Sequence, residues 1–190
     1  MSEKNLYDLS DEELILEFQQ KNNQRAFEIL VKRFKNPLIN FVYRFLGDYD
    51  SSVDVVQDTF VKVYRYKDRY SNVAKFSTWI YTIATNLAKT EYQRRKRAKF
   101  ISIFNVGENE NYIEIKDNNL RPDKNVYNKY KEEQIQKALL KVKVIYREPV
   151  ILRDIQGLTY EEISEILNIE VGTVKSRINR GRKRLQKLLK

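Results

Sequence analysis

Basic and polar side chains suited to binding nucleic acid recur with helical spacing near the C-terminal end of the chain. The stretch 171–190 contains eight Lys or Arg residues and no Asp or Glu. Lys and Arg neutralise phosphates, while Ser, Asn and Arg can hydrogen-bond to base edges in the DNA major groove. One face of the predicted helix carries Ser176, Asn179, Arg180 and Lys183, with Lys175 and Arg177 at its margins.

The elements that must position these side chains are two helices joined by a tight turn. Thr159 and Glu162 have the spacing of a capping box, which predicts the start of the first helix, and Asn168 suits its left-handed stop. The second helix has an apolar stripe opposite its basic face, formed by Val174, Ile178, Gly181 and Leu185. A charge run alone is typical of a solvated helix on an ordinary bundle. The cap, the turn and the stripe together predict a helix-turn-helix.

The composition of the 190-residue chain favours an all-α protein with a polyanionic partner. An apolar content of 42% is enough for a globular core, and five Gly and three Pro residues provide few turns for a many-stranded sheet. The net charge of +10 points first to nucleic acid and second to an anionic membrane surface.

The sequence contains neither Cys nor His, and this excludes several kinds of site. Disulfides, thiolate zinc sites and Cys nucleophiles need Cys, while His is the usual general base and the commonest metal ligand. Enzymes that use only carboxylates or Lys stay possible, but we expect no metal and no cofactor. Residues 1–4 lack a basic-then-apolar signal and no apolar run reaches membrane-spanning length. We therefore expect a cytoplasmic protein without membrane insertion.

The apolar pattern divides the chain into two small helical domains joined by a flexible linker. We expect an N-terminal domain over residues 1–100, a linker over 101–125, and a C-terminal domain over 126–190 that contains the helix-turn-helix. Positions 105–125 hold six Asn and five acidic residues, a composition typical of a linker. This acidic segment could shield one of the basic stretches, although a solvated spacer is the simpler interpretation.

Single residues predict where helices start and stop in the N-terminal domain. Ser10, followed by three acidic residues, predicts a capped helix. Pro37 either breaks the next helical pattern or restarts a helix at its first turn. Gly47 is expected to end that element, and either Ser51 or Ser52 to cap the following helix.

The helix expected over 53–67 has an apolar face and a polar, acidic face. The apolar face consists of Val53, Val56, Phe60 and Val63. The opposite face carries Asp54, Gln57, Asp58, Val61 and Arg65. A single exposed valine is common, yet an acidic face with an apolar centre also suits docking of a partner helix. The residues alone leave both interpretations open.

Aromatic and basic residues crowd the next loop and helix, expected over 68–75 and 78–99. The rings are Tyr66, Tyr70, Phe76, Trp79 and Tyr81, and the side chains expected to face outward are Thr78, Thr82, Thr85, Asn86, Lys89, Gln93 and Lys96. Rings beside a basic face suit the stacking of single-stranded bases, whereas core packing is the alternative role. We expect Phe76 and Trp79 to be partly buried and the segment as a whole still to contact DNA.

Two parts of the chain resemble the extracytoplasmic-function (ECF) sigma factors of bacterial RNA polymerase. The first conserved domain of that family is similar to DVVQDTFVKVYR at 54–65 and KFSTWIYTIATN at 75–86. The second is similar to the segment from REPVILR at 147–153 through GTVKSR at 172–177. Many activators share a helix-turn-helix, but both domains in this order and spacing are specific to the family. The likeness covers nearly the whole chain apart from the linker.

The resemblance implies a non-enzymatic initiation subunit that binds core RNA polymerase, directs it to promoters and helps to melt the DNA. The matched positions imply polymerase contact for Asp54, Gln57, Asp58 and Val61, which favours docking for that face. They imply minus-ten contact for Tyr70, Ser71, Asn72, Lys75, Trp79, Asn86, Lys89 and Thr90, with a flipped base held by the loop 67–75. They imply minus-thirty-five contact for Thr173, Lys175, Ser176, Arg177, Asn179 and Arg180.

The resemblance also implies a separate protein that controls this one. The sequence has no His/Cys motif for zinc, so an anti-sigma factor that covers both DNA-binding faces is expected to supply the control. The chain departs from the family at two places. Lys143 and Val144 stand where relatives often have Leu-Pro, which affects a helix boundary, and Thr90 stands where some relatives carry an amide, which affects minus-ten preference.

Two other functions compete with this interpretation. A stand-alone transcriptional activator would share the helix-turn-helix but would not need the acidic face at 54–65 or the helix at 76–86. A carboxylate-dependent nuclease would use Asp54 and Asp58, which lie one helical turn apart, but no third ligand or general base is evident in the sequence.

Overall fold

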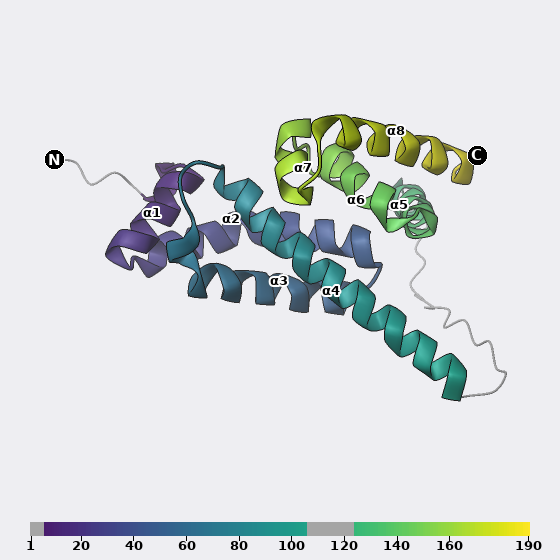
Figure 1. Cartoon of the computed structure of the whole chain (residues 1–190), viewed down its shortest axis with the longest axis horizontal. Coiled ribbons are helices and arrows are strands. Elements are labelled where there is room, and N and C mark those ends of the chain that lie inside the picture. The colour runs from purple at the N-terminus through teal and green to yellow at the C-terminus, as the bar shows by residue number, and fades with distance from the viewer. Residues whose placement is uncertain (1–5, 106–123) are drawn as a thin grey trace.

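The computed structural model describes residues 6–105 and 124–190, and every regular element in these two ranges is a helix (Figure 1). The all-α fold with two helical domains is therefore confirmed. Most of the expected linker, residues 106–123, lies outside the described residues. None of the described helices is long and apolar enough to cross a membrane.

Four long helices build the N-terminal part of the molecule, and the second of them is central. They are α1 (Asp11–Lys21), α2 (Gln24–Leu46), α3 (Tyr49–Arg65) and α4 (Phe76–Asn105). Short 3-10 turns, η1 (Leu6–Asp8) and η2 (Lys67–Arg69), precede α1 and follow α3. α2 contacts each of the other three long helices, so its buried residues form the middle of the core.

Two predicted helix ends in this part agree with the structure. Ser10 caps α1 in a capping box with Glu13, since each accepts a hydrogen bond from the backbone N–H of the other. Gly47 ends α2 with a φ of 78°, a left-handed conformation that glycine adopts without strain. The side chain of Leu140 also packs so closely over Gly47 that a Cβ there would lie 2.5 Å from its Cδ1.

Three other predicted boundaries are wrong. Pro37 lies inside α2, which runs through it without a break because the helix buries large side chains on both sides of the proline, including Phe34 and Phe41. Asp48, not Ser51 or Ser52, caps α3, because its carboxylate accepts the N–H of Ser51. The next helix, α4, was expected over 78–99 but starts at Phe76 and extends to Asn105.

The C-terminal part contains α5 (Lys124–Lys141), α6 (Val144–Val150), the π-helical turn η3 (Ile151–Ile155), α7 (Tyr160–Leu167) and α8 (Val171–Leu188). The predicted capping box of Thr159 and Glu162 is present, and Asn168 ends α7 with a φ of 50°. Val174, Ile178 and Gly181 of the predicted stripe are buried, and Leu185 is half-buried. The helix-turn-helix is thus confirmed in its local detail. Pro149, expected in a first turn, lies near the end of α6 instead.

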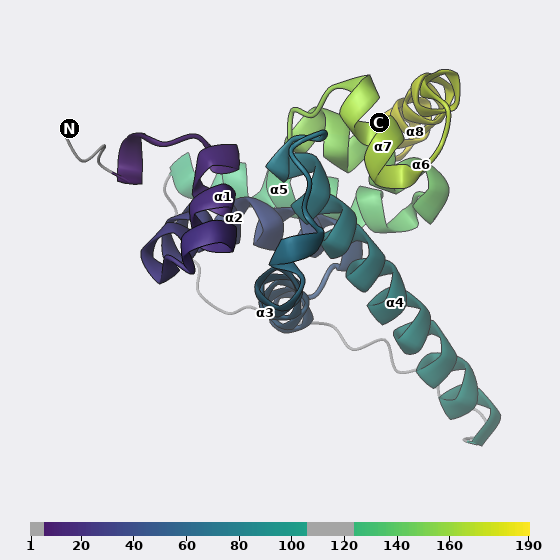
Figure 2. The same ribbon diagram turned by 60° about the vertical axis from the view of Figure 1, so that its left-hand side comes forward.

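The C-terminal helices pack directly against the N-terminal ones and share a continuous apolar core with them. Both views show them along one side of α4, whose far end projects from the body (Figures 1 and 2). Arg147 of α6 forms a second contact between the two parts. Its buried guanidinium donates to the Phe45 carbonyl at the end of α2, at 2.7 Å, and to carbonyls at the end of α5. A cation at two helix C-termini satisfies carbonyls that have no partner within their own helix.

Gly181 allows α8 to approach α6 closely, and this contact can be tested. A Cβ at position 181 would lie 2.5 Å from Val150 Cγ2 and 2.9 Å from the Tyr146 carbonyl oxygen. We expect Gly181→Ala to lower the free energy of unfolding by about 1 kcal/mol or more, since overpacking outweighs the gain in helix propensity. Urea unfolding followed by circular dichroism measures this change.

Gly172→Ala is the matched control, because a Cβ at position 172, in the first turn of the same helix, meets no atom within 4 Å. That variant should be neutral or more stable by up to about 1 kcal/mol. Equal stability of the two variants would contradict the close approach at Gly181.

Candidate nucleic-acid interface

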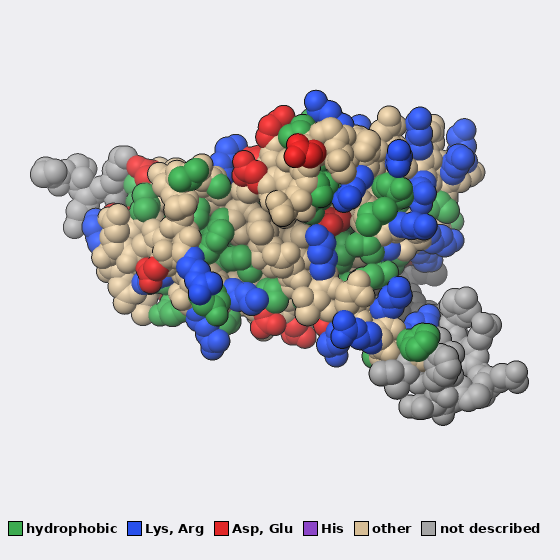
Figure 3. Space-filling view, in the orientation of Figure 1, with side chains coloured by type: hydrophobic (Ala, Val, Ile, Leu, Met, Phe, Trp, Pro, Cys, Tyr) green, Lys and Arg blue, Asp and Glu red, His purple; other side chains and the backbone are tan. Residues whose placement is uncertain are grey.

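The outer face of α8 presents the predicted minus-thirty-five side chains to solvent. Lys175, Ser176, Asn179 and Arg180 are exposed, while Thr173 and Arg177 are half-buried at the edges of this face. The Ser176 hydroxyl donates to the Thr173 carbonyl at 2.9 Å, a local bond that a base edge can replace. Basic side chains dominate the surface over α8 (Figure 3).

Two tyrosines, which sequence reasoning did not single out, hold the cations near α8. The Lys175 ammonium lies 5.6 Å from the ring centroid of Tyr160, and the Arg184 guanidinium lies 4.4 Å from that of Tyr146. A hydrogen bond with Arg180, together with the nearby cations, holds the pKa of the Tyr146 hydroxyl below its usual value. These contacts restrict long basic side chains and so reduce the entropy that they lose on binding an anion.

The second candidate surface is the outer side of α4. Asn86 and Thr90 are exposed one turn apart, and the Thr90 hydroxyl donates to the Asn86 carbonyl at 2.9 Å. A shallow groove continues from this point toward the end of the helix, lined by Lys89, Thr90, Gln93, Arg94, Arg97 and Ala98. Arg94 and Arg97 were not among the predicted contacts, although they fall on the same helical face in steps of three or four residues.

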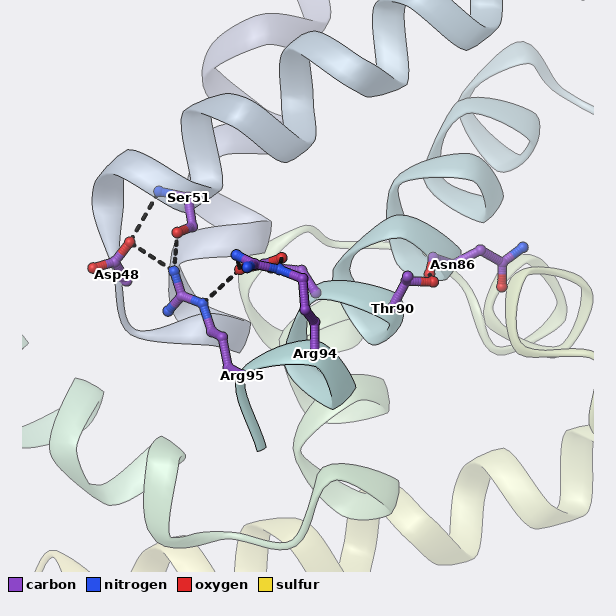
Figure 4. A network of polar contacts seen from close by, with 7 residues as sticks. Asp48, Ser51, Asn86, Thr90, Arg94 and Arg95 are labelled. Atoms are coloured by element: carbon purple, nitrogen blue, oxygen red, sulfur yellow. Dashed lines mark hydrogen bonds and ion pairs between the residues drawn. The ribbon is translucent and has the colours of Figure 1, made fainter. Parts of the chain in front are cut away.

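A polar network fixes the basic half of α4 against the start of α3 (Figure 4). Arg95 donates to Glu91 at 2.7 Å, to Asp48 at 2.9 Å and to the Ser51 hydroxyl. Glu91 also binds Arg94, and this bond, together with Arg95, holds the pKa of the Glu91 carboxyl below its usual value despite burial. Asn86 and Thr90 lie on the other side of α4, so the network leaves them free (Figure 4).

Among the contact residues predicted in and beside the loop before α4, some are exposed and others are buried. Ser71 and Asn72 are exposed and Trp79 is half-buried. Tyr70 is only 6% exposed: its ring packs on Phe76 and Trp79, and its hydroxyl donates to the Ala74 carbonyl at 2.9 Å. Tyr70 therefore supports the loop from inside and is not available for base stacking in this arrangement. A tyrosine in a loop can be buried in this way because its ring packs against apolar side chains while its hydroxyl donates a hydrogen bond to a backbone carbonyl.

The C-terminal part covers much of the face of α4 that was expected to point outward. Lys75 pairs with Glu162 of α7 at 2.8 Å, and Lys89 pairs with Glu148 of α6 at 3.0 Å. Thr78 and Thr85 were expected outside, yet they are 4% and 1% exposed. They lie between the two paired lysines on one helical stripe, which explains their burial.

The acidic face of α3 is exposed along its length. Asp54, Gln57 and Asp58 are solvent-facing, and Val61 is 46% exposed. Acidic side chains gather along the edge of the molecule formed by α3 (Figure 3). On the opposite side of α3, Val56 and Val63 are buried as expected, while Val53 and Phe60 are only half-buried. Val55 and Thr59, which were not expected in the core, are buried as well, because α3 packs against both α2 and α4.

The acidic side chains in the described ranges do not gather into a metal site. No group of three His, Cys, Asp or Glu side chains in residues 6–105 and 124–190 could hold a metal ion. Asp54 and Asp58, the pair considered for a nuclease, point to solvent from α3. The two basic surfaces, in contrast, combine cations, amides and hydroxyls in the way that DNA binding requires.

Protein families match the same two parts of the chain. Sigma-70 region 2 matches residues 30–98, which span most of α2 and continue into α4. Sigma-70, region 4 matches residues 132–185, which contain the helix-turn-helix.

Relatives match over nearly the full length. The chain is 36% identical over 172 residues to the ECF RNA polymerase sigma factor SigW of Bacillus subtilis, covering 90% of this chain and 92% of the relative. It is 33% identical over 175 residues to the ECF RNA polymerase sigma-E factor of Escherichia coli K12, covering 90% of each chain.

Two solved structures have a similar fold. CnrH in complex with the cytosolic domain of CnrY has a TM-score of 0.71 and 25% identity over 94% of this chain and 96% of that one. The sigma factor RpoE in complex with the anti-sigma factor NepR from Bartonella quintana has a TM-score of 0.67 and 28% identity over 87% and 97%. The chain therefore belongs to the extracytoplasmic-function family of RNA polymerase sigma factors, non-enzymatic subunits that direct the polymerase to promoters for transcription initiation.

Proposed function

We propose that this sigma factor divides its work among three surfaces: α3 binds core polymerase, the loop 67–75 with α4 binds the minus-ten element, and α8 binds the minus-thirty-five element. The observation that carries this proposal is the separation of charge, with an acidic exposed face on α3 and basic exposed faces on α4 and α8 (Figure 3). Phosphates repel the first surface and attract the other two. We further propose domains of residues 1–100 and 126–190 and a linker between them.

On α3, Asp54, Gln57, Asp58 and Val61 form the polymerase-binding surface. The exposed valine at the centre of a polar face supplies apolar area, and the two carboxylates supply charge for basic groups of the partner. Apolar centres with polar rims are the usual anatomy of protein interfaces. Neither carboxylate is needed inside the fold, because both side chains point to solvent.

On α4, Asn86 and Thr90 read bases of the minus-ten element, while Lys75 and Lys89 bind its backbone. Ser71, Asn72 and Trp79 surround a flipped base, and the base stacks on Trp79 because Tyr70 is buried. Stacking on an aromatic side chain compensates for part of the cost of unpairing. The groove residues Arg94 and Arg97 extend the phosphate-binding track.

On α8, Ser176, Asn179 and Arg180 read base edges of the minus-thirty-five element from the major groove. Lys175 and Arg177 bind phosphates, and Thr173 contributes from the first turn, where the helix dipole favours an anion. A helix-turn-helix presents the start of its second helix to the bases, and this is where these residues lie.

We also propose that an anti-sigma factor regulates this protein and that it works in the cytoplasm, where promoter DNA and polymerase are found. RpoE of Bartonella quintana, a structure with a similar fold, is bound to such a factor. No zinc motif in the sequence offers a built-in alternative.

Run-off transcription on genomic DNA with purified core polymerase tests the proposal as a whole. Adding this protein should produce transcripts with defined start sites, and no second sigma factor should be needed. An activator would give no product under these conditions, and neither would a nuclease.

Asp58→Lys should weaken polymerase binding at least tenfold without unfolding, because the exposed side chain would change sign within the docking surface. Fluorescence titration with core polymerase measures the binding, and thermal unfolding measures the fold. Glu28→Lys, the same charge change at an exposed position of α2, is the matched control and should bind normally. A large loss of thermal stability in Asp58→Lys would instead mark a structural role.

Asn86→Ala and Arg180→Ala should fail at different steps. Arg180→Ala should weaken binding to a minus-thirty-five duplex by about 1–3 kcal/mol, because it removes a base contact. Asn86→Ala should leave that binding intact and reduce permanganate reactivity of the melted minus-ten region in the polymerase complex. Equal loss of both activities in either variant would contradict the proposed division.

A further inference from the structure

The loop proposed to hold a flipped base, residues 67–75, has an exposed tip between two ends that contact the rest of the N-terminal part. Ser71, Asn72 and Val73 form the tip, and Val73 is 94% exposed. The loop passes beside α1 on its way to α4 (Figure 1). Side chains of α1 contact both the first end of the loop and the first residue of α4, where the loop ends. Helix α1 therefore sets the frame from which the tip extends.

Gln19 of α1 holds the first end of the loop. Its side-chain amide donates to the Lys67 carbonyl at 2.5 Å and to the Tyr70 carbonyl at 3.0 Å. A glutamine amide has two hydrogens to donate, so this half-buried side chain uses both of them on the loop backbone. The two carbonyls lie at the start of η2 and just after its end. Gln19 therefore fixes the direction in which the chain leaves this turn toward the tip.

Lys67 makes the reciprocal contact, from the loop to α1. Its ammonium donates to the Phe18 carbonyl in the last turn of α1 at 3.1 Å and to Asn22 Oδ1 at 2.8 Å. The same ammonium lies 4.3 Å from the centroid of the Phe18 ring. A cation is favourable at a helix C-terminus, where carbonyls lack partners within the helix. This lysine thus anchors the loop to α1, and its charge is directed away from the tip.

The second end of the loop is held by an acid of α1. The Glu12 carboxylate accepts the backbone N–H of Phe76, the first residue of α4, at 3.0 Å. A carboxylate at this place satisfies an N–H that has no partner within the helix and interacts favourably with the helix dipole. Gln19 and Glu12, about two turns apart on α1, therefore hold the two ends of the loop.

The contact of Gln19 with Tyr70 extends to the ring proposed to stack on the flipped base. The ring centroid of Tyr70 lies 5.4 Å from that of Trp79 and 5.9 Å from that of Phe76. A shift in the backbone of Tyr70 would move the ring against which Trp79 packs. Gln19 is thus linked to the base-stacking side chain through one intervening residue.

We propose that α1 shapes the base-capturing loop in advance, and that Gln19 is the positioning residue on which the selectivity of this loop for a flipped base depends. The inference rests on the proposed function of the loop 67–75 and deepens it. Ordering a free loop would cost conformational entropy at the moment of binding. A loop whose ends are already held loses less, so more of the stacking energy of the base appears as affinity.

Gln19→Glu tests the proposal with little change in size. A carboxylate cannot donate a hydrogen bond, and its charge would face the two carbonyl oxygens that Gln19 now binds. Gln20→Glu is the matched control, because it places the same charge on the neighbouring, exposed position of α1. Thermal unfolding of both variants measures their stability.

The measurement uses the full-length chain in complex with core polymerase. Fluorescence anisotropy follows the binding of dye-labelled single-stranded oligonucleotides with the non-template minus-ten sequence of a promoter mapped by run-off transcription. Each base in turn is replaced by an abasic site, and the ratio of the abasic Kd to the intact Kd gives the selectivity at that position. The captured base is the position at which Trp79→Ala lowers this ratio most.

This ratio separates positioning from a general loss of structure. If a variant were partly unfolded, the folded fraction would reduce the affinity for both oligonucleotides by the same factor, and the ratio would not change. In the wild type and in Gln20→Glu we expect a ratio on the order of tenfold at the captured base, the size of one stacking contact. Gln19→Glu should lower this ratio about fivefold and leave the ratios at the other positions unchanged.

The possible outcomes distinguish this inference from the proposed function. An unchanged ratio in Gln19→Glu, an equal fall in Gln20→Glu, or a fall at every position would each overturn the positioning role of Gln19 and leave capture of the base by the loop in place. If no position in the wild type depends on Trp79, the proposed capture fails, and the inference fails with it.

Discussion

The arrangement of the two parts of the chain depends on which groups pack against the two sides of α4. Phe76, Ile80 and Ala84 bury one side of this helix against the N-terminal core. The other side is polar and basic, and a helix with such a face needs either solvent or an anionic partner. In this arrangement part of that side is covered by α7 and α6, which supply carboxylates, and by Gln156 at the end of η3, which supplies an amide acceptor.

The balance of energies in the domain contact favours reversibility. Apolar burial and the hydrogen bonds of Arg147 and Gln136 to the end of α2 favour packing. The burial of Glu148 opposes packing at neutral pH, since a carboxyl with a raised pKa contributes stability only when protonated and loses that contribution as pH rises. An interface that includes such a cost can be opened by a partner that offers better contacts to either half. Under the proposed function this property is required, because Lys75 and Lys89 are also the cations proposed to bind promoter DNA.

Much of the fold could be predicted from the sequence where the signal is local. The capping boxes at Ser10 and Thr159, the left-handed stop at Asn168 and the glycine at Gly47 each depend on interactions within a few residues. The stripe beginning at Val174 follows from helical periodicity alone, and the helix-turn-helix follows from it. These features would hold in any tertiary setting, which is why the sequence suffices for them.

Features decided by distant parts of the chain could not be predicted in the same way. Pro37 reads as a break, but packing on both sides of the proline keeps α2 continuous. Tyr70 was expected to contact DNA and Thr85 to face outward, yet the ring of Tyr70 packs in an aromatic cluster and Thr85 is buried on the side of α4 that the C-terminal helices cover. No periodicity within α4 could reveal which residues pack against its polar side, because those residues lie more than fifty positions away in the sequence.

The charge pattern explains why the sequence identifies the basic side of α4 as a candidate site but does not show which anion its lysines pair with in the folded chain. A row of cations specifies the sign of its partner, and Lys75 and Lys89 accept a carboxylate as readily as a phosphate. The sequence therefore indicates that α4 binds an anion, and the packing shows that the chain itself supplies one when no other partner is present. Asn86 and Thr90, which can read bases, stay exposed beside the covered lysines. The two proposed functions of α4 are thus separate in space: the C-terminal helices pair with its lysines and leave Asn86 and Thr90, the side chains proposed to read bases, uncovered.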